Sequence, residues 1–238
     1  MALVFEVKKI AAVECPDKVK SLLPVSCLYT IGNADLLNKK AISICGSRDA
    51  SESALKWAYK FGQQAAQHGV AVISGYARGV DRQAHKGALD AGGETIAVLP
   101  EGIQHFRLVK ELKPLVDLDS NFLAISMFEP DAIWRTWRAM ERNKLIVGLS
   151  VGLFVIEARE RGGTIDAARE AVRQGKRLWA VAYSKETPGR KGNRKLLATS
   201  AIPLKHMGDL RRALEDAMKE PPAEVEQLVM NVVGHGDA

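Results

Sequence analysis

Short apolar runs alternate with amphipathic stretches along the middle of the chain. Runs of five to seven residues that predict buried strands lie at 41–45, 70–74, 95–99, 122–126, 151–157 and 177–183. Patterns of helical period fill most of the gaps, at 51–68, 80–91, 163–175 and 207–220. Such alternation is typical of parallel strands in a sheet covered on both faces. The chain is therefore predicted to have an α/β fold, with a doubly wound, mostly parallel Rossmann-like sheet and helices on both faces.

The same pattern predicts one main domain with two short flanking segments. Residues 1–38 precede the first clear strand and are expected to form an N-terminal extension packed on that domain. The Rossmann-like domain is expected to span residues 39–220, and residues 221–238 form a C-terminal tail that begins at two prolines. A length of 238 residues is enough for one large α/β domain.

Composition excludes several classes of protein. No stretch approaches the roughly 18 apolar residues that span a membrane, and the first residues do not resemble a signal peptide, so a cytoplasmic protein is expected. The three cysteines are widely spaced and suit reduced thiols, and the five histidines never reach metal-ligand spacing. Glycine motifs for dinucleotides or ATP and the serine elbow of hydrolases are absent, so no cofactor and no metal is expected.

Charge is unevenly distributed along the chain. The net charge is +6, yet residues 135–195 alone hold 15 Lys or Arg against 6 Asp or Glu. A basic segment in an otherwise mildly acidic chain indicates a polyanionic partner. The alternative is a solvated basic face that binds nothing.

Three loops with suggestive residues follow predicted strands at the edge where α/β sheets bind ligands. They contain Gly46, Ser47 and Arg48; Ser74, Gly75 and Gly79; and Gly162, Gly163 and Thr164. Arg48 is a potential bidentate phosphate donor, although a surface ion pair would explain it equally. First-turn N–H groups of the helix after Gly79 are expected to point into the cleft, and Thr164 is a plausible N-cap. The glycines could also be simple tight turns.

Two acidic residues and a histidine allow more than one interpretation. Asp81 and His85 share a helical face and form either a proton-transfer pair or a structural pair. Glu157, at the end of an apolar strand, could be a general base, but capping of backbone amides of the next loop is slightly favoured.

Aromatic and basic residues are mixed within the basic segment. Trp134 and Trp137 lie among arginines, a combination typical of single-strand binding, although core packing would also explain two tryptophans three residues apart. A second basic stretch, residues 187–201, is expected to be a flexible loop that follows a nucleic-acid backbone.

Taken in order, the motifs resemble the DNA-processing protein A (DprA/Smf) family. The resemblance covers residues 28–204 and rests on "AISICGSRDAS", "VISGYARGVDRQAHKGALDAGGETIAVLP", "RNKLIVGLSVGLFVIEA" and "TPGRKGNRKLLATSAIPL". It implies a Rossmann-like domain without enzymatic activity that binds single-stranded DNA and loads the RecA recombinase during DNA uptake, natural transformation and recombination. It also implies a homodimer. No membrane is expected as a partner.

The resemblance assigns a set of DNA- or phosphate-binding positions. They are Gly46, Ser47, Arg48, Ser74, Gly75, Ala77, Arg78, Gly79, Asp81, His85, Arg142, Asn143, Lys144, Gly162, Gly163, Thr164, Asn193 and Lys195. Within the set, His85 is expected to organise its turn together with Asp81, and the direction of Arg78 stays open.

The chain departs from the family pattern at several positions. Lys144 replaces the second arginine of an R-N-R series and loses its bidentate fork. "RGGTIDA" replaces S-G-S-L-I-T-A, and the resemblance includes neither the helical N-terminal domain nor the C-terminal winged helix of many members.

Two other functions stay open. The first is a LOG-like nucleoside monophosphate phosphoribohydrolase, which the chain resembles distantly, although Glu170 stands six residues beyond Thr164 where that motif requires three. The second is a sensor that binds a small nucleotide at the same sheet edge.

Overall fold

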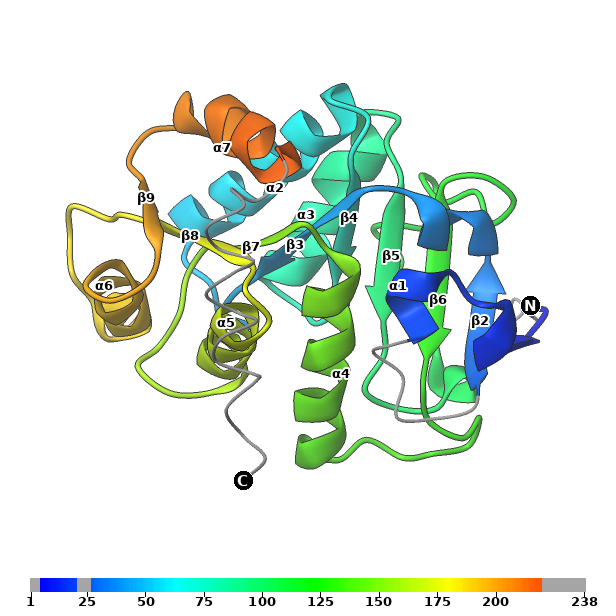
Figure 1. Ribbon diagram of the computed structural model, residues 1–238. Helices are drawn as coiled ribbons and strands as arrows, with labels where there is room; N and C mark the ends of the chain where they lie inside the picture. Colours follow the sequence, from blue (N-terminus) through cyan, green and yellow to red (C-terminus); the bar gives the residue numbers. More distant parts are fainter. Residues whose placement is uncertain (1–4, 21–26, 220–238) are drawn as a thin grey trace.

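The structure is a computed structural model that describes residues 5–20 and 27–219 (Figure 1). The tail predicted at 221–238 lies outside this range. The strands are β1 (Lys8–Ala11), β2 (Cys27–Gly32), β3 (Ala41–Cys45), β4 (Ala71–Ser74), β5 (Thr95–Val98), β6 (Phe122–Ser126), β7 (Gly152–Val155), β8 (Arg177–Val181) and β9 (Ile202–Leu204). The helices are α1 (Asp17–Lys20), α2 (Glu52–Gln67), α3 (Val80–Asp90), α4 (Thr136–Leu149), α5 (Gly163–Arg173), α6 (Lys191–Leu197) and α7 (Asp209–Met218).

The strands of the described ranges form one sheet in the order β1-β2-β6-β5-β4-β3-β7-β8-β9. The strands from β6 to β9 in that order are parallel, and β1 and β2 add an antiparallel margin next to β6. The order reverses at β3, which has β4 on one side and β7 on the other. This reversal is the position where open α/β sheets bind ligands. The predicted fold class is confirmed.

Helices cover both faces of the sheet, and alternate residues of each strand enter different cores. Ile42 and Ile44 of β3 belong to a core with α2, α3 and α7, whereas Ala41 belongs to a core with α4. Figure 1 shows α2, α3 and α7 grouped together, away from α4 and α5. Burial on both faces explains why the central strands appear in the sequence as unbroken apolar runs. Among the described residues, no helix combines the length and apolar character needed to cross a membrane.

Two segments differ from their predicted form. Residues 1–38 were expected to precede the first strand, but they supply β1 and β2. The stretch 187–201 was predicted as a flexible loop, and this prediction is wrong because 188–190 form a 3-10 helix that continues into α6. Leu196 is buried there, and a Cβ at Gly192 would lie 2.3 Å from the carbonyl oxygen of Arg159. Close packing against the loop after β7 therefore orders this segment.

Candidate functional site

The loops that follow β3, β4 and β7 line a groove of about 440 Å³ at the point where the strand order reverses. We call it the switch-point groove. Its lining includes many of the residues that the sequence singled out: Gly46, Ser47, Arg48, Gly75, Ala77, Asp81, Arg142, Asn143, Gly162, Gly163 and Thr164. The carboxyl ends of neighbouring parallel strands place these loops side by side.

Backbone contacts hold the loop between β3 and α2 from two sides. The N–H of Ser47 donates to the carbonyl oxygen of Glu157 after β7, at 2.7 Å. The carbonyl oxygen of Ser47 accepts from the N–H of Val80 at the start of α3, at 3.2 Å. Arg48 projects from this fixed loop with an exposed side chain, and it has no ion-pair or hydrogen-bond partner among residues 5–20 and 27–219. An unpaired guanidinium on a loop whose backbone is held in place is available to an anion.

Two glycines allow the close approach of these loops. Gly79 has φ 84° and ψ −128°, and a Cβ there would lie 2.4 Å from the carbonyl oxygen of Ser47 and 2.6 Å from that of Arg48. A Cβ at Gly75 would lie 2.5 Å from Nη1 of Arg142. Gly79 is therefore required by the close approach of two backbone segments, and a side chain at Gly75 would displace the guanidinium of Arg142.

The N-terminus of α3 offers fewer free donors than the sequence indicated. The N–H of Val80 donates to the Ser47 carbonyl oxygen, and the N–H of Arg82 donates to that of Ala77, each at 3.2 Å. The expectation that the first-turn N–H groups of α3 point into the cleft is therefore wrong for these two. They donate instead to carbonyl oxygens of the neighbouring loops.

The N-terminus of α5 is more open to the groove. The helix begins at Gly163, and Gly162 is its N-cap with φ 121°, so the prediction of Thr164 as N-cap is wrong. Within the described part of the chain, the N–H groups of Gly163 and Thr164 have no acceptor. The amide of Asn143 on α4 donates to the carbonyl oxygen of Gly163 at 3.2 Å and so holds this loop in place. This end of α5 presents donors and a positive dipole end to a ligand.

A buried carboxyl and a buried guanidinium lie beneath the groove. Nη1 of Arg142 donates to the carbonyl oxygens of Gly75 and Val98, so this arginine joins the ends of β4 and β5. Oδ2 of Asp81 accepts from the N–H of Ala77 at 3.3 Å. Burial raises the pKa of Asp81 to about 6 against the opposing charge of Arg142, and burial lowers the pKa of Arg142 to about 10. Arg142 is thus mainly structural.

The stability of the protein is expected to depend on pH through Asp81. The native carboxyl retains its proton up to about pH 6, whereas the unfolded one releases it near its usual pKa of 3.8. The native state binds more protons in that window, so this group lowers the free energy of unfolding as pH rises from 4 to 6. Asp81→Asn removes the effect. Urea denaturation from pH 4 to pH 7 gives the free energy of unfolding of both proteins. Over this range the free energy of unfolding of the variant is expected to rise by roughly 2–3 kcal/mol relative to that of the native protein. A difference independent of pH would contradict this prediction.

His85 does not form the expected pair with Asp81. Its Nδ1 shares a hydrogen bond with Oγ1 of Thr95 on β5, and the ring is fully buried. Burial lowers the pKa of His85 to about 3, so the ring is neutral at physiological pH. The expectation that His85 organises its turn with Asp81 is corrected: it fixes α3 to β5.

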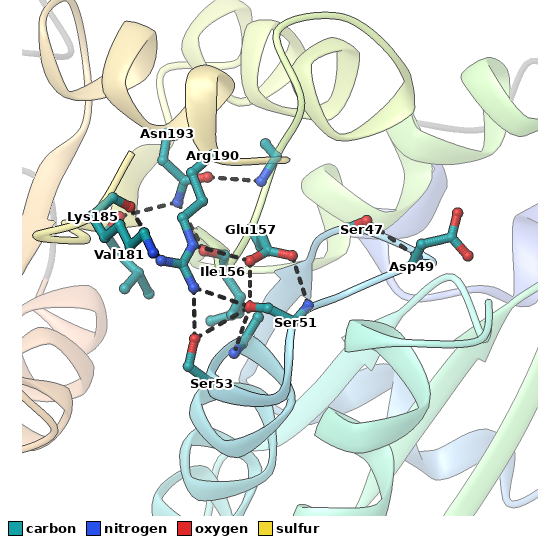
Figure 2. A network of polar contacts seen from close by, with 12 residues as sticks. Ser47, Asp49, Ser51, Ser53, Ile156, Glu157, Val181, Lys185, Arg190 and Asn193 are labelled. Atoms are coloured by element: carbon teal, nitrogen blue, oxygen red, sulfur yellow. Dashed lines mark hydrogen bonds and ion pairs between the residues drawn. The ribbon is translucent and has the colours of Figure 1, made fainter. Parts of the chain in front are cut away.

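Glu157 accepts from a backbone amide, as the sequence favoured, but the amide is that of Ser51, before α2, and does not belong to the loop that follows β7. Its carboxylate is buried and accepts from the N–H of Ser51 at 2.9 Å, from the Ser51 hydroxyl at 2.5 Å and from Nε of Arg190 at 3.3 Å (Figure 2). Ser51 is the N-cap of α2, and Arg190 also lies 3.9 Å from the ring centre of Tyr183. All of these contacts lie outside the groove lining, so a role as general base has no support.

Two predicted site residues are buried behind the groove. The Asn193 amide donates to the carbonyl oxygens of Ile156 and Val181 and accepts from the N–H of Ala158, and it is almost fully buried (Figure 2). The Ser74 hydroxyl donates to the carbonyl oxygen of Ile44 at 2.6 Å. The assignment of both to the ligand-facing surface is corrected, because their polar atoms are committed to joining strand ends.

Two predicted lysines also lie outside the groove lining. Nζ of Lys144 is 2.8 Å from Oε1 of Glu141, one helical turn earlier on α4. Lys195 is exposed on α6. Arg159 and Arg161, within the "EARERGG" stretch, line the groove but were missing from the predicted set. Arginines next to the glycine pair were the signal that could have found them.

The tryptophans of the basic segment are not core residues. Trp134 is 47% exposed and lines the groove, and Trp137 is 56% exposed. Trp137 packs edge-on against Phe128, with 5.9 Å between ring centres. The core-packing interpretation is wrong for both residues. Trp134 instead offers an aromatic face beside the arginines.

The described ranges contain no group of three or more His, Cys, Asp or Glu side chains that could hold a metal ion.

Comparisons with known proteins identify a family. The family model described as "DNA recombination-mediator protein A" matches residues 10–215. Protein Smf of Escherichia coli K12 is 34% identical over 181 residues, which are 74% of this chain and 47% of that protein. The chain thus spans about half the length of this curated relative.

Solved structures give the same result for the fold. The crystal structure of DNA processing protein A from Streptococcus pneumoniae has a TM-score of 0.76 at 28% identity, covering 86% of this chain and 73% of that one. DNA processing protein A from Helicobacter pylori has a TM-score of 0.77 at 22% identity, and the match covers 91% of this chain and 99% of that one. The description of the latter structure concerns the single-stranded DNA binding mode of that protein.

Proposed function

The chain belongs to the DNA recombination-mediator protein A family, and from this premise we propose that it binds single-stranded DNA in the switch-point groove. The observation that carries the proposal is the combination in one groove of the exposed Arg48, which has no partner among the described residues, with the exposed face of Trp134. Arginines neutralise phosphates and aromatic faces stack on bases, which is the chemistry of single-strand binding. The single-stranded DNA binding mode described for the relative from Helicobacter pylori supports it.

An unpaired strand suits this groove better than a duplex. The exposed aromatic face of Trp134 stacks only on bases that are free of a partner strand. The donors at the N-terminus of α5, together with Arg159 and Arg161, supply phosphate contacts that carry no base specificity. Binding is therefore expected to be strong for single strands, weak for duplexes and tolerant of sequence.

The predicted site residues divide into two roles under this proposal. Those that contact the strand are Ser47, Arg48, Ala77, Asn143, Gly162, Gly163 and Thr164. Those that position the loops are Gly46, Ser74, Gly75, Gly79, Asp81, His85, Arg142 and Asn193. Arg78, whose direction the sequence left open, is exposed and pairs with Asp49 at 2.5 Å.

The role of the bound strand follows from the family. Recombination mediation is a binding and transfer function and not a catalytic one. We propose that the chain passes single-stranded DNA to a RecA-type recombinase during DNA uptake and recombination, and that it acts as a homodimer. The phosphoribohydrolase alternative has less support, because the carboxylate of Glu170 accepts hydrogen bonds from Arg173 and Gln174 and lies outside the groove lining.

The test is the affinity for a fluorescent oligo-dT as a function of salt. The logarithm of the binding constant is expected to fall by about 0.7 per neutralised phosphate for each tenfold rise in salt. Arg48→Ala is expected to weaken binding about tenfold and to reduce this slope by about 0.7, similarly for all sequences.

The matched control is Arg212→Ala, on an exposed position of α7 on the other side of the sheet, which should change affinity less than twofold. Absence of oligo-dT binding by the native protein at low salt would overturn the proposal. Preference for a duplex would also contradict it.

A further inference from the structure

A second hollow adjoins the switch-point groove on the side of β4 and β5. It has a volume of about 420 Å³ and is lined by the loops that follow those two strands. Both hollows include Arg48, Gly75, Ala77, Trp134 and Arg142 in their linings, so they are direct neighbours. We call the second hollow the arginine basin, because Arg48, Arg78, Arg82, Arg107 and Arg142 line it.

The arginine basin is the more positive of the two hollows. Its lining holds five arginines and His105 against one carboxylate, that of Glu101. The lining of the switch-point groove holds four arginines against Asp49, Asp81 and Asp166. A concave surface lined by one sign of charge concentrates ligands of the opposite sign. The motif residues Arg48, Arg78 and Arg142 contribute to this lining, and Arg107 adds a positive charge from outside the motifs.

Two guanidinium groups of the basin, those of Arg82 and Arg107, are oriented by neighbours and keep donors free. Arg107 makes both of its hydrogen bonds through Nη1, to the carbonyl oxygens of Gln104 at 2.8 Å and Phe106 at 2.7 Å. Its Nη2 and Nε have no partner within the described ranges. Arg82 donates through Nε to the carbonyl oxygen of Tyr76 at 3.3 Å, and its Nη1 lies 3.7 Å from Oε1 of Glu111. Such partial pairing lowers the entropy lost when a phosphate binds.

The floor of the basin has an unusual backbone. Tyr76 has φ 60°, and it is the one residue other than glycine with positive φ in the described part of the chain. Its hydroxyl accepts from the N–H of Val109 at 3.0 Å and donates to the carbonyl oxygen of Arg107 at 3.4 Å. Tyr76 therefore ties the loop that carries Arg107 to the end of β4. Strained residues of this kind persist where the surrounding structure over-determines them, often at ligand sites.

We propose that the arginine basin binds phosphates of the same DNA strand after it leaves the switch-point groove, and that Trp134 stacks on a base between the two. This inference rests on the function proposed above and extends its binding surface to Arg82, His105 and Arg107. The position of Trp134 in both linings gives the strand an aromatic contact where it passes from one hollow to the other.

The test compares two lengths of oligo-dT, about 5 and about 15 nucleotides, which bracket the site sizes of single-strand binding modules. The native protein and the double variant Arg82→Gln/Arg107→Gln are titrated with each. The short oligonucleotide is expected to bind both proteins within about twofold, because the switch-point groove suffices for it. For the long oligonucleotide, the double variant is expected to bind about tenfold more weakly than the native protein. The salt slope of the variant should be smaller by 1–2, in line with about two lost phosphate contacts.

The matched control removes the same charge elsewhere. Arg211→Gln/Arg212→Gln, on exposed positions of α7, should leave the binding of both lengths within about twofold. If Arg82→Gln/Arg107→Gln fails to fold, as judged by circular dichroism, the single variant Arg107→Gln replaces it, because among the described residues the side chain of Arg107 bonds only to the carbonyl oxygens of Gln104 and Phe106 in its own loop. An unchanged affinity of the folded variant for the long oligonucleotide, or an equal loss for both lengths, would overturn the inference.

Two further outcomes separate this inference from its premise. If the native protein binds neither length, the proposed function itself fails. If thymidine monophosphate at micromolar concentration binds the native protein but not the double variant, and leaves the affinity for the long oligonucleotide unchanged, the basin binds a free nucleotide and the inference is overturned while the premise stands.

Discussion

Glu157→Ala is expected to lower the free energy of unfolding by about 3–5 kcal/mol, the usual cost of removing one partner of a buried ion pair. The substitution leaves the guanidinium of Arg190 without its carboxylate in a site where the side chain of Glu157 is only 4% exposed and that of Arg190 14%. It also removes the acceptor of the Ser51 N–H, so the N-cap of α2 loses its support (Figure 2). The end of β7, the start of α2 and the segment before α6 would lose the carboxylate that they share.

Urea denaturation of three variants tests this prediction. Glu157→Gln keeps an acceptor for Ser51 but loses the charge. Its free energy of unfolding should therefore lie between those of the native protein and Glu157→Ala. Glu186→Ala is the control, because Glu186 pairs with Arg194 on the surface and its loss should cost about 0–1 kcal/mol. A loss for Glu157→Ala no larger than that of the control would show that the network does not stabilise the fold.

Gly79→Ala is expected to lower the free energy of unfolding by more than about 2 kcal/mol and to weaken single-strand binding at least tenfold. The dihedral angles of Gly79 belong to a region that is essentially restricted to glycine and costs about 1–3 kcal/mol for other residues. The new Cβ would also overlap the carbonyl oxygens of Ser47 and Arg48, which are backbone atoms and cannot rotate away. Relief of the overlap requires the loop that carries Arg48 to move.

Gly92→Ala is the matched control for Gly79→Ala. Gly92 also has a positive φ, of 73°, but no atom lies within 4 Å of the position that a Cβ would take there, so only the conformational cost of about 1 kcal/mol remains. Thermal melting gives the stability, and titration with oligo-dT gives the binding. Equal effects of the two substitutions on both measurements would show that the contact between α3 and the Ser47–Arg48 loop is unimportant.

The sequence predicts the centre of the sheet well and its margins poorly. Strands β3 to β8 are buried on both faces and stand out as apolar runs, whereas β1 is mostly exposed and β9 has only three residues, including Pro203. Edge strands lack a partner on one side, so their residues carry little pattern. Helix α4 is obscured for a different reason: its first turns carry exposed Trp137 and Met140, which weaken the amphipathic pattern.

For the candidate site, the sequence predicts which loops meet but not which donors stay free. The parallel order of the strands determines which loops meet, because it places the loops at the strand ends side by side. Which donors stay free depends on partners far along the chain. The amide of Asn193 donates to the carbonyl oxygens of Ile156 and Val181, and the ring of His85 shares a hydrogen bond with Thr95. Arg107 lies in a loop without any motif, and only the fold brings it near Arg48.

The position of β3 in the sheet has a consequence for synthesis of the protein. A nascent chain that has been made as far as Ser126 contains β1 to β6, which pair with one another in an unbroken half-sheet. Its outermost strand is β3, whose second edge is filled only when β7 emerges and Leu153 pairs with Ser43. An open edge on an apolar strand is a template for pairing with other chains. Interruption of translation between β6 and β7 is therefore expected to yield an aggregating fragment.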